Sequence, residues 1–567
     1  VDGRERVKAD YDLFGAYIAA EDFEGARWCL DDLQRSFAPR SVAKDDGAVL
    51  EDSSLLATLG TYLSLKTAEE RNVLERKARE LDEIFAKLMQ FRATHPFDER
   101  GSGLARYPRE LAIFGTLVEV QTELFGEVGA ISAIERISIH HTLSALSRRM
   151  GVKPCSLAEV REELLLDSDH GVLFLQRAPI QTGGCRLFAF DQERIRWAAI
   201  GSLDEYLKSI RRLIEQLHSP RNLTDQWERL SQESVERLLP PQIRELFDDW
   251  RFVTLVGFDD ELWFPFECLV VDGSILGTTK AVDHLPSLPL GVHLARRRAA
   301  TKRHFDKDLL LVVAPEHSEA ACAAYPDLEP LLITEDQIHT LTAPFPPDSV
   351  HILARKQATF EALMELDGTF SLLHIFAHGV AGDPLDGSFA GILLGSRTQD
   401  KTGVLDRKNV AELPKASAVF LSACSAGQDV IRTMEGGLNN LGGAFLEHGA
   451  DAVVFSHEDL LAGQTIDLMG LVSGEVARGS SLAAALTSAR QELVRRGVTD
   501  PRLHSTLRVW GLGQQSAFAS PRTRLSGSQD HFGSIESDRG PGIRIGLTVM
   551  IFSLVALFFW RRRRSAF

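Results

Sequence analysis

The sequence predicts an α/β protein with a mostly parallel sheet flanked by helices, preceded by an α-helical domain and followed by one transmembrane helix. Three observations support this fold class. Apolar stretches of strand length alternate with helical stretches between residues 155 and 518, the pattern of a sheet buried on both faces. Residues 1–150 show helical spacing and almost no strand-like alternation. A polar segment, 519–542, precedes a final apolar stretch.

Length and composition limit the possible classes of protein. The 567 residues exceed what one hydrophobic core usually holds, so we expect two or three domains. With 44% hydrophobic and 25% charged residues, the composition is that of a globular protein. A net charge of -16 argues against general binding of a nucleic-acid backbone. The six cysteines show neither metal-ligand spacing nor a disulfide framework, and we expect no metal or other cofactor.

The first 150 residues carry small and aromatic side chains at helical spacing. Ala20, Phe23, Ala26, Leu30, Leu33 and Phe37 follow this spacing before Pro39 ends the helix. This stretch is similar to the second helix of a tetratricopeptide repeat, although no 34-residue period is present. A solenoid of degenerate repeats and a non-repeating bundle both remain open. The chain begins at Val1 in helical character without a signal peptide, so either its start is unusual or a longer N-terminal region is missing.

The next elements alternate in type from residue 155 onward. We predict a helix over 156–165 that starts at Ser156, a strand over 171–178, two strands around a polar turn over 185–200, and a helix over 202–217. Pro240-Pro241 interrupts the helices that follow, and further strands lie within 251–277. The remainder alternates strand and helix, with strands at 308–315, 370–379, 415–427 and 450–457 and helices at 358–366, 437–449 and 481–497. In parallel sheets, functional groups gather in loops at the carboxyl ends of strands. His378 and Cys424 both follow predicted strands in this way.

A thiol and an imidazole at neighbouring strand ends suit nucleophilic catalysis. A thiol needs a base to become a thiolate near neutral pH, and His378 is placed to be that base for Cys424. The backbone amides of Gly379 and Cys424 would then form an oxyanion hole. Small residues surround the thiol over 422–427 and leave room for a peptide. These features predict a cysteine endopeptidase.

The motifs resemble those of the CHAT domain, a caspase-like peptidase domain. Ser-Ala-Cys-Ser-Ala-Gly at 422–427 lies downstream of His378-Gly379, in the caspase order of histidine before cysteine. Further matching segments lie at 264–267 (FPFE), 285–287 (LPS), 435–456 and 508–513. The resemblance covers about 155–514 and implies that His378 is the general base and Cys424 the nucleophile. His374 occupies the family's first histidine position, where it either lines the site or is packed as a structural residue. The N-terminal helices would then bind a regulatory protein.

The sequence also departs from the family pattern. Ser425 replaces the usual acidic residue after the Ala-Cys pair, and 457–459 (HED) replaces the usual Trp-Pro. Because this region contributes to substrate recognition in related peptidases, the residue preferred before the scissile bond (P1) is open. Local acidity motivates a hypothesis that a basic P1 is held by Asp383, Asp386, Glu458 or Asp459. Two rivals stay open: a catalytically silent scaffold, and a small-molecule hydrolase, for which no pocket motif is present.

The end of the chain predicts a membrane anchor. Residues 545–560 carry no charge and are followed by Arg561–Arg564. Sixteen helical residues cover about 24 Å, and Ile543 with snorkelling of Arg544 and Arg561 extends this toward the ~30 Å hydrocarbon core. We therefore predict a single-pass membrane protein with a transmembrane helix over 543–560 and a basic tail over 561–567. The side of the membrane that holds the globular part stays open.

Overall fold

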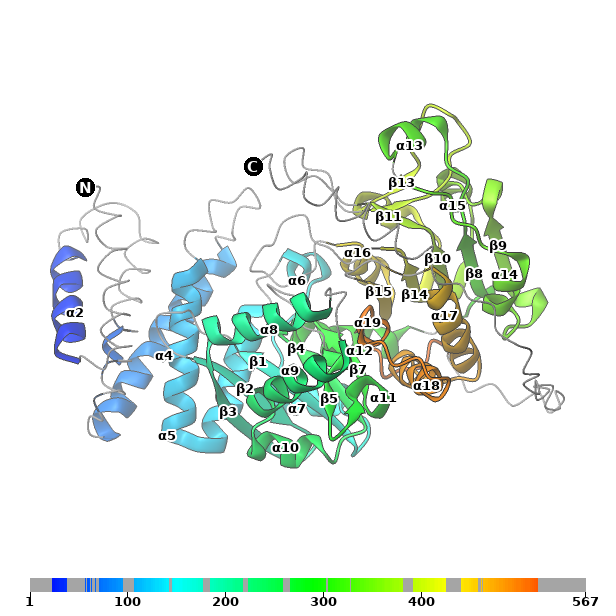
Figure 1. Ribbon diagram of the computed structural model, residues 1–567. Coiled ribbons are helices and arrows are strands. Elements are labelled where there is room, and N and C mark those ends of the chain that lie inside the picture. The colour runs from blue at the N-terminus through cyan, green and yellow to red at the C-terminus, as the bar shows by residue number, and fades with distance from the viewer. Residues whose placement is uncertain are drawn as a thin grey trace, which may run out of the picture. The chain divides into compact units, whose positions relative to one another are not determined.

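The computed structural model describes most of the chain up to residue 518 (Figure 1). The described residues are 23–37, 57, 59–61, 63, 67, 71–94, 107–141, 145–176, 184–217, 223–258, 266–301, 304–326, 328–380, 391–424, 440–456, 460 and 462–518. All of them belong to one compact unit, Val1–Pro521, which is separate from residues 522–567.

A large sheet runs through the described part of the chain and confirms the predicted α/β class. Its eleven strands lie in the order β3-β2-β1-β4-β7-β16-β15-β14-β10-β8-β9. Their bounds are β1 His170–Gln176, β2 Gly184–Phe190, β3 Ile195–Ser202, β4 Phe252–Val256, β7 Ala281–Leu285, β8 Lys307–Val313, β9 Val350–Ala354, β10 Thr369–Phe376, β14 Lys415–Ser422, β15 Ala452–Ser456 and β16 Leu507–Gly511. Two small sheets accompany it: β5 (Val270–Val271) with β6 (Ser274–Ile275), and β11 (His378–Val380), β12 (Gly391–Leu393) and β13 (Val404–Leu405).

The strand directions divide the sheet into two halves. β15, β14, β10, β8 and β9 are mutually parallel. β16 runs antiparallel to β15 but parallel to β7, which is parallel to β4 and β1. The strands β16, β7, β4 and β1 therefore run opposite to β15, β14, β10, β8 and β9, and β2 is antiparallel to both β1 and β3. The carboxyl ends of β15, β14, β10 and β8 all meet at one rim of the sheet. We call this edge the active rim.

Helices cover both faces of the sheet. One buried cluster joins the sheet to α5 (Tyr107–His141), α7 (Leu157–Glu163), α12 (Leu288–Ala300) and α16 (Leu441–His448). On the opposite face, one cluster contains α14 (Glu335–Thr342), α17 (Ala462–Ala477) and α18 (Leu482–Arg495), and another contains α8 (Leu203–Leu217), α9 (Leu223–Leu238) and α10 (Pro241–Phe247). Along β10, Leu373 and Ile375 face the first cluster while Leu372 and Phe376 face the second, as expected for alternating strand side chains.

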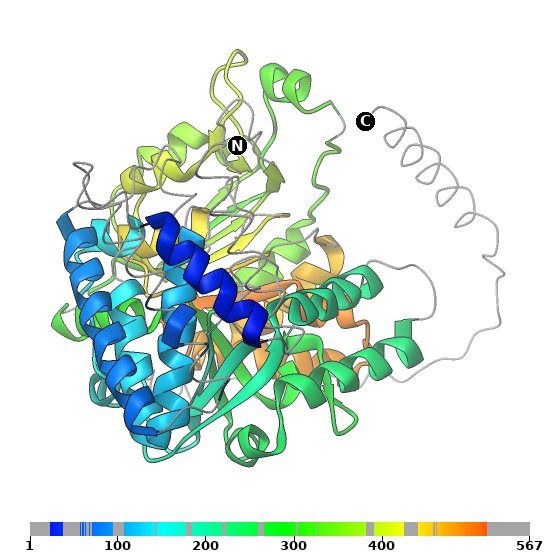
Figure 2. The same ribbon diagram turned by 90° about the vertical axis from the view of Figure 1, so that its left-hand side faces the viewer.

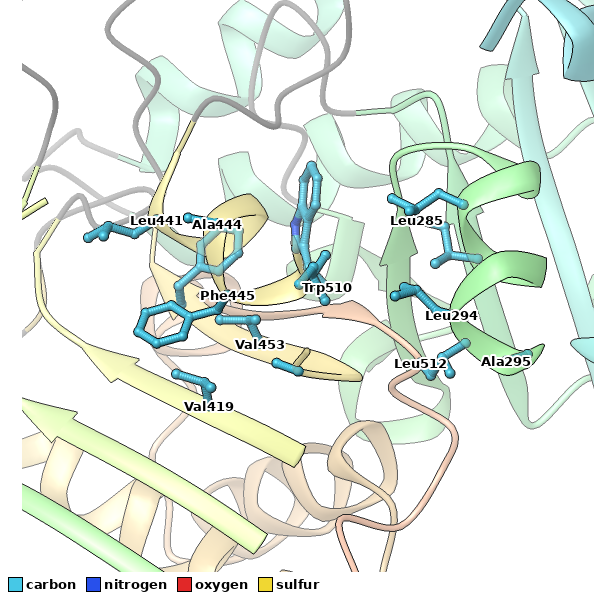
Figure 3. Close-up of a cluster of buried hydrophobic side chains, with 14 of the residues drawn as sticks. Leu285, Leu294, Ala295, Val419, Leu441, Ala444, Phe445, Val453, Trp510 and Leu512 are labelled. Carbon is cyan, nitrogen blue, oxygen red and sulfur yellow. The ribbon is translucent and has the colours of Figure 1, made fainter. Parts of the chain in front are cut away.

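Trp510 of β16 lies at the centre of the first cluster. Figure 3 shows its side chain between Phe445 of α16 on one side and Leu285 and Leu294 on the other. The ring is 3% exposed, so it removes a large apolar area from water where the two half-sheets meet.

Local signals in the sequence explain several element boundaries. Ser156 caps α7 through a capping box with Glu159, which confirms the predicted helix start. Pro241 is the first residue of α10, after α9 has ended at Leu238. The remaining described helices are α2 Phe23–Phe37, α4 Arg71–Thr94, α6 Ala145–Met150, α11 Leu276–Thr279, α13 Glu319–Ala324, α15 Phe360–Met364 and α19 Pro501–Ser505, and η2 Phe266–Cys268 is a 3-10 turn.

The described residues of the N-terminal region up to Met150 are helical except Thr67, which lies in a turn. In α2, Ala26, Leu30 and Leu33 are buried at helical spacing. Figures 1 and 2 show α4 and α5 side by side. The predicted division at 150–155 stays a prediction, because α5 also packs into the core of the sheet: Ile134 and Ile137 belong to the same buried cluster as β10 and β14.

The structure contradicts the predicted membrane localisation. None of the helices in the part of the chain that the structure describes combines the length and apolar character needed to cross a bilayer. The 35-residue α5 is long enough, but it carries Glu119, Glu123 and Glu127 along its length. The predicted span at 543–560, with the linker 519–542 and the tail 561–567, lies outside the described residues.

Candidate active site

The candidate nucleophile and base follow two adjacent parallel strands. β10 and β14 pair in register up to Phe376 and Ser422. His378 and Cys424 each lie two residues beyond this pair, so both stand at the active rim. The strands are apolar over Phe370–Phe376 and Ala416–Leu421 except at three residues, all buried (Ser371, His374 and Ser417), so burial on both faces fixes their register. The sheet therefore brings together the two strand ends that the sequence singled out.

Gly379 touches the backbone of Cys424. A Cβ atom built on Gly379 would overlap the carbonyl oxygen of Cys424 and lie 3.1 Å from its amide nitrogen. Only glycine leaves room for this approach. The sequence predicted that a glycine here admits a close backbone approach by substrate, and the structure shows that the nearest backbone is that of Cys424 itself.

The His378 ring is held by a backbone carbonyl. Its Nε2 lies 2.7 Å from the carbonyl oxygen of Glu329. Because a carbonyl only accepts hydrogen bonds, Nε2 carries the hydrogen, and in the neutral ring the lone pair is on Nδ1. Residue 378 also begins β11, whose pairing with β12 through Leu393 anchors its backbone. The ring is therefore prepared to accept a proton at Nδ1.

A backbone amide contacts the thiol from the next strand along. Leu460, which follows β15, donates its N–H to Sγ of Cys424 at 3.3 Å. A hydrogen bond to the charged form of a thiol favours the thiolate. Sequence reasoning missed both Leu460 and Glu329 because they act through backbone groups, which leave no signature in residue type.

His374 is a packed structural residue rather than part of the site. It is 1% exposed, its Nε2 lies 2.9 Å from Oγ of Ser422, and its ring meets Phe420 edge-on at 5.5 Å. Burial lowers the pKa of His374 to about 3. The residue is neutral at physiological pH, which agrees with the structural alternative.

A second histidine that the sequence reasoning missed lies beside His378. The His317 and His378 ring centroids are 5.6 Å apart, with the planes tilted by 45°. Burial lowers the pKa of His317, and a charge on His378 lowers it further, while the Leu394 backbone partly opposes the shift. The only signal in the sequence was its place after β8, the strand that neighbours β10.

The structure does not test the predicted substrate-binding acids. Asp383, Asp386, Glu458 and Asp459 lie outside the described residues. Among the described residues, no group of three or more His, Cys, Asp or Glu side chains is arranged to hold a metal ion. Of the other cysteines, four are buried, and burial raises the pKa of Cys155 to about 11, so that thiol is unreactive near neutral pH.

The acidic residue of the FPFE motif belongs to a buried ionic cluster at the junction of the half-sheets. Glu267 lies 3.0 Å from Nε2 of His284 on β7 and 3.6 Å from Nε of Arg508 on β16. Burial opposes ionisation of Glu267, but Arg508, His284 and Arg490 together outweigh it and lower its pKa to about 2. Glu267 therefore links η2, β7 and β16 through buried charges.

The fold and the rim define an α/β protein that presents a thiol and an imidazole at one edge of a mostly parallel sheet. The CHAT domain family matches residues 228–522, just over half of the chain. The protein therefore belongs to the CHAT domain family. No curated protein matches it.

Solved structures with a similar chain path share little sequence with this protein. Two crystal structures of the Saccharomyces cerevisiae separase–securin complex align with TM-scores of 0.42 and 0.40 at 10% and 11% identity, covering 89% and 87% of this chain and 46% and 38% of theirs. The Arg-specific cysteine proteinase gingipain R aligns with a TM-score of 0.33 at 13% identity, covering 55% of this chain and 73% of its own. This chain thus spans less than half the length of the separase chains, and at these scores the likeness carries no functional argument.

Proposed function

We propose that this protein is a cysteine endopeptidase in which Cys424 is the nucleophile and His378 the general base. One observation carries the proposal: β10 and β14 are adjacent and parallel, and the backbone of Gly379 touches that of Cys424 directly after them. Membership of the CHAT domain family supports the same interpretation, because the matched residues 228–522 include both His378 and Cys424 and the resemblance of their motifs assigns them these roles.

The proposed reaction uses the groups gathered at the active rim. Nδ1 of His378 takes the thiol proton, and Sγ of Cys424 attacks the scissile carbonyl carbon. The resulting oxyanion accepts hydrogen bonds from the Gly379 and Cys424 amides. His378 then gives its proton to the leaving amine as the C–N bond breaks. Water, deprotonated by His378, releases the acyl group and restores the thiol.

Two backbone groups support this chemistry. The Glu329 carbonyl keeps the hydrogen on Nε2 of His378, so the basic nitrogen stays available throughout. It also stabilises the ring once His378 is positively charged, since the N–H···O bond then becomes charge-assisted. The Leu460 amide favours the thiolate before attack.

We also propose that the helical N-terminal region recruits a partner protein or gates the peptidase. α5 is joined to the sheet by buried apolar contacts and by the pair of Glu119 with Arg186 on β2, 3.5 Å apart with both side chains 10% exposed. A change in these helices therefore has a physical route to the sheet. If α5 and the sheet are coupled in this way, the helices and the sheet should unfold in one transition during denaturation.

A panel of electrophilic peptides tests the function. Peptides with basic, acidic and neutral P1 residues are reacted with the wild type, Cys424→Ala and His378→Ala. We expect covalent labelling of the wild type only at Cys424, none in Cys424→Ala, and labelling slower by about 100-fold in His378→Ala.

Each outcome of this panel bears on a separate part of the proposal. Equal labelling of wild type and Cys424→Ala removes the nucleophile assignment. An unlabelled wild type favours the scaffold reading, in which the peptidase-like domain is silent. Equal rates for all three P1 classes remove the basic-P1 hypothesis, which rests on Asp383, Asp386, Glu458 and Asp459, while leaving the reaction in place.

A further inference from the structure

The four parallel strands at the active rim deliver four groups in spatial order. The strand order β15-β14-β10-β8 matches Leu460, Cys424, His378 and His317. Contacts join each neighbour to the next: the Leu460 amide to Sγ of Cys424, the Cys424 backbone to Gly379, and the His378 ring to the His317 ring. His317 therefore ends a continuous row that begins on the far side of the nucleophile.

The backbone around His317 is anchored on both sides. The Glu316 amide donates to the Arg355 carbonyl at 3.4 Å, and Oγ of Ser318 donates to the Lys401 carbonyl at 2.5 Å. The adjacent amides of Glu319 and Ala320 donate to the side chain and backbone of Gln399. A side chain between two such anchors has little freedom to move away from its neighbour.

The turn that directs the chain to His317 is strained. Ala314 adopts a φ of 48°, in the left-handed region that non-glycine residues rarely occupy. Its amide still donates to the Phe376 carbonyl at 3.1 Å, which is the last rung between β8 and β10. The chain thus leaves β8 by a sharp turn beside Phe376, which lies two residues before His378 begins β11. Such strain persists where the surrounding structure fixes it, often beside functional groups.

The His317 ring suits a neighbour that becomes positively charged. Both of its nitrogens are buried, and neither has a hydrogen-bond partner of good geometry within the described residues, although the Leu394 backbone lies near. Burial lowers the pKa of His317 and a charge on His378 would lower it further, so the neutral form of the His317 ring is favoured beside a charged His378. A neutral aromatic ring beside an imidazolium limits its rotation without repelling its charge.

We propose that His317 is a positioning residue whose ring flanks the His378 ring and holds that base toward Cys424. The inference rests on the proposed dyad and adds a residue to it. The His317 ring contacts the His378 ring, so we propose that His317 affects Cys424 only through His378. The expected consequence is a larger thiolate fraction at Cys424 near neutral pH when His317 is present.

The test measures alkylation of Cys424 by iodoacetamide, followed by mass spectrometry of the peptide that contains it. This readout needs no substrate, so it works whether or not the protein cleaves peptides. Near pH 7 we expect His317→Ala to react about three- to tenfold more slowly than the wild type, and His317→Phe, which keeps a flat ring, to stay within about threefold. Near pH 10 the thiol ionises without a base, so both variants should equal the wild type.

The outcomes separate the inference from the dyad. His317→Ala reacting at the wild-type rate near pH 7 overturns the inference, and so does a deficit that persists near pH 10, which indicates a general packing role. If His378→Ala reacts like the wild type near pH 7, the dyad itself fails. The double variant His317→Ala/His378→Ala should be no slower than His378→Ala alone, because His317 acts through His378, and additive losses contradict that.

Discussion

At the scale of single residues, the active rim depends on one close backbone contact. Gly379 presses against Cys424 so closely that a methyl group at 379 has no space. The strand ends are held in this contact by seven register pairs between β10 and β14. The same contact therefore places the proposed nucleophile and the segment that carries the proposed base, so a change at residue 379 directly affects Cys424.

We expect Gly379→Ala to abolish most reaction at Cys424. Its Cβ must displace the Cys424 carbonyl, which moves both proposed oxyanion amides, so labelling by a peptide electrophile should fall by about 100-fold or more. Gly463→Ala is the matched control, since a Cβ there meets no atom within 4 Å. That variant should label normally. Labelling of Gly379→Ala at the control's rate would show that the contact is not needed.

At the scale of elements, the junction of β7 with β16 combines few backbone contacts with several buried charges. The two strands share one register pair, His284 with Trp510, whose rings stack at 6.3 Å with planes 5° apart. Glu267, Arg490 and Arg508 surround the pair at 1%, 2% and 0% exposure. A broken member of such a cluster leaves the others charged and buried, which is costly.

Substitutions at this junction should have opposite effects on stability. Glu267→Gln leaves Arg508 and Arg490 without their counter-charge and should lower the free energy of unfolding by about 3–5 kcal/mol.

At Asp283, burial raises the pKa from 3.8 to about 7, against the Thr254 hydrogen bond and the charge of His284. Because the folded pKa exceeds the unfolded one, the stability contributed by the protonated carboxyl is lost as pH rises from about 4 to about 7.

The stability of Asp283→Asn relative to the wild type should therefore increase as pH rises. Relative to the wild type, its free energy of unfolding should improve by about 2 kcal/mol between pH 5 and pH 8. Urea denaturation at both pH values measures this difference for each variant. A wild type whose stability is level across that range contradicts the assignment of Asp283.

The sequence predicted those elements whose signal is local. β8, β10, β14 and β15 appear where continuous apolar stretches predicted strands, and Ser156 begins its helix through the expected capping box. Strand order and the reversal at β16 depend on long-range packing, which periodicity does not encode. The candidate site divides in the same way: motifs in the sequence pointed to His378 and Cys424. Glu329 and Leu460 contribute backbone atoms, and His317 joins the row only because β8 neighbours β10.

At the scale of the whole molecule, the N-terminal helices and the sheet share a hydrophobic core. Ile134 of α5 is 1% exposed and belongs to the buried cluster that also holds Val419 of β14, whereas Val128 on the same helix is 72% exposed. The cluster continues across the face of the sheet to α16. A structural change in α5 therefore has a continuous path of buried side chains to β14, the strand that precedes Cys424.

We expect the described helices and sheet to unfold in one transition. Ile134→Ala should lower the free energy of unfolding by about 2–5 kcal/mol, and Val128→Ala should change it by less than about 0.5 kcal/mol. Circular dichroism and tryptophan fluorescence should report the same midpoint in each variant. Separate midpoints, with Ile134→Ala shifting only one, would show that the helices fold independently and that gating lacks this route.

The reversal at β16 has a consequence for how this architecture can diversify. The parallel strands β1, β4 and β7 end at one edge of the sheet, and β15, β14, β10 and β8 end at the opposite edge. At 3.3 Å per residue, β14 alone spans about 25 Å between the two edges. The carboxyl ends of β1, β4 and β7 thus lie at the edge of the sheet opposite the thiol. Insertions there can be gained or lost without disturbing the reacting groups, so one border is free to vary while the other stays constrained.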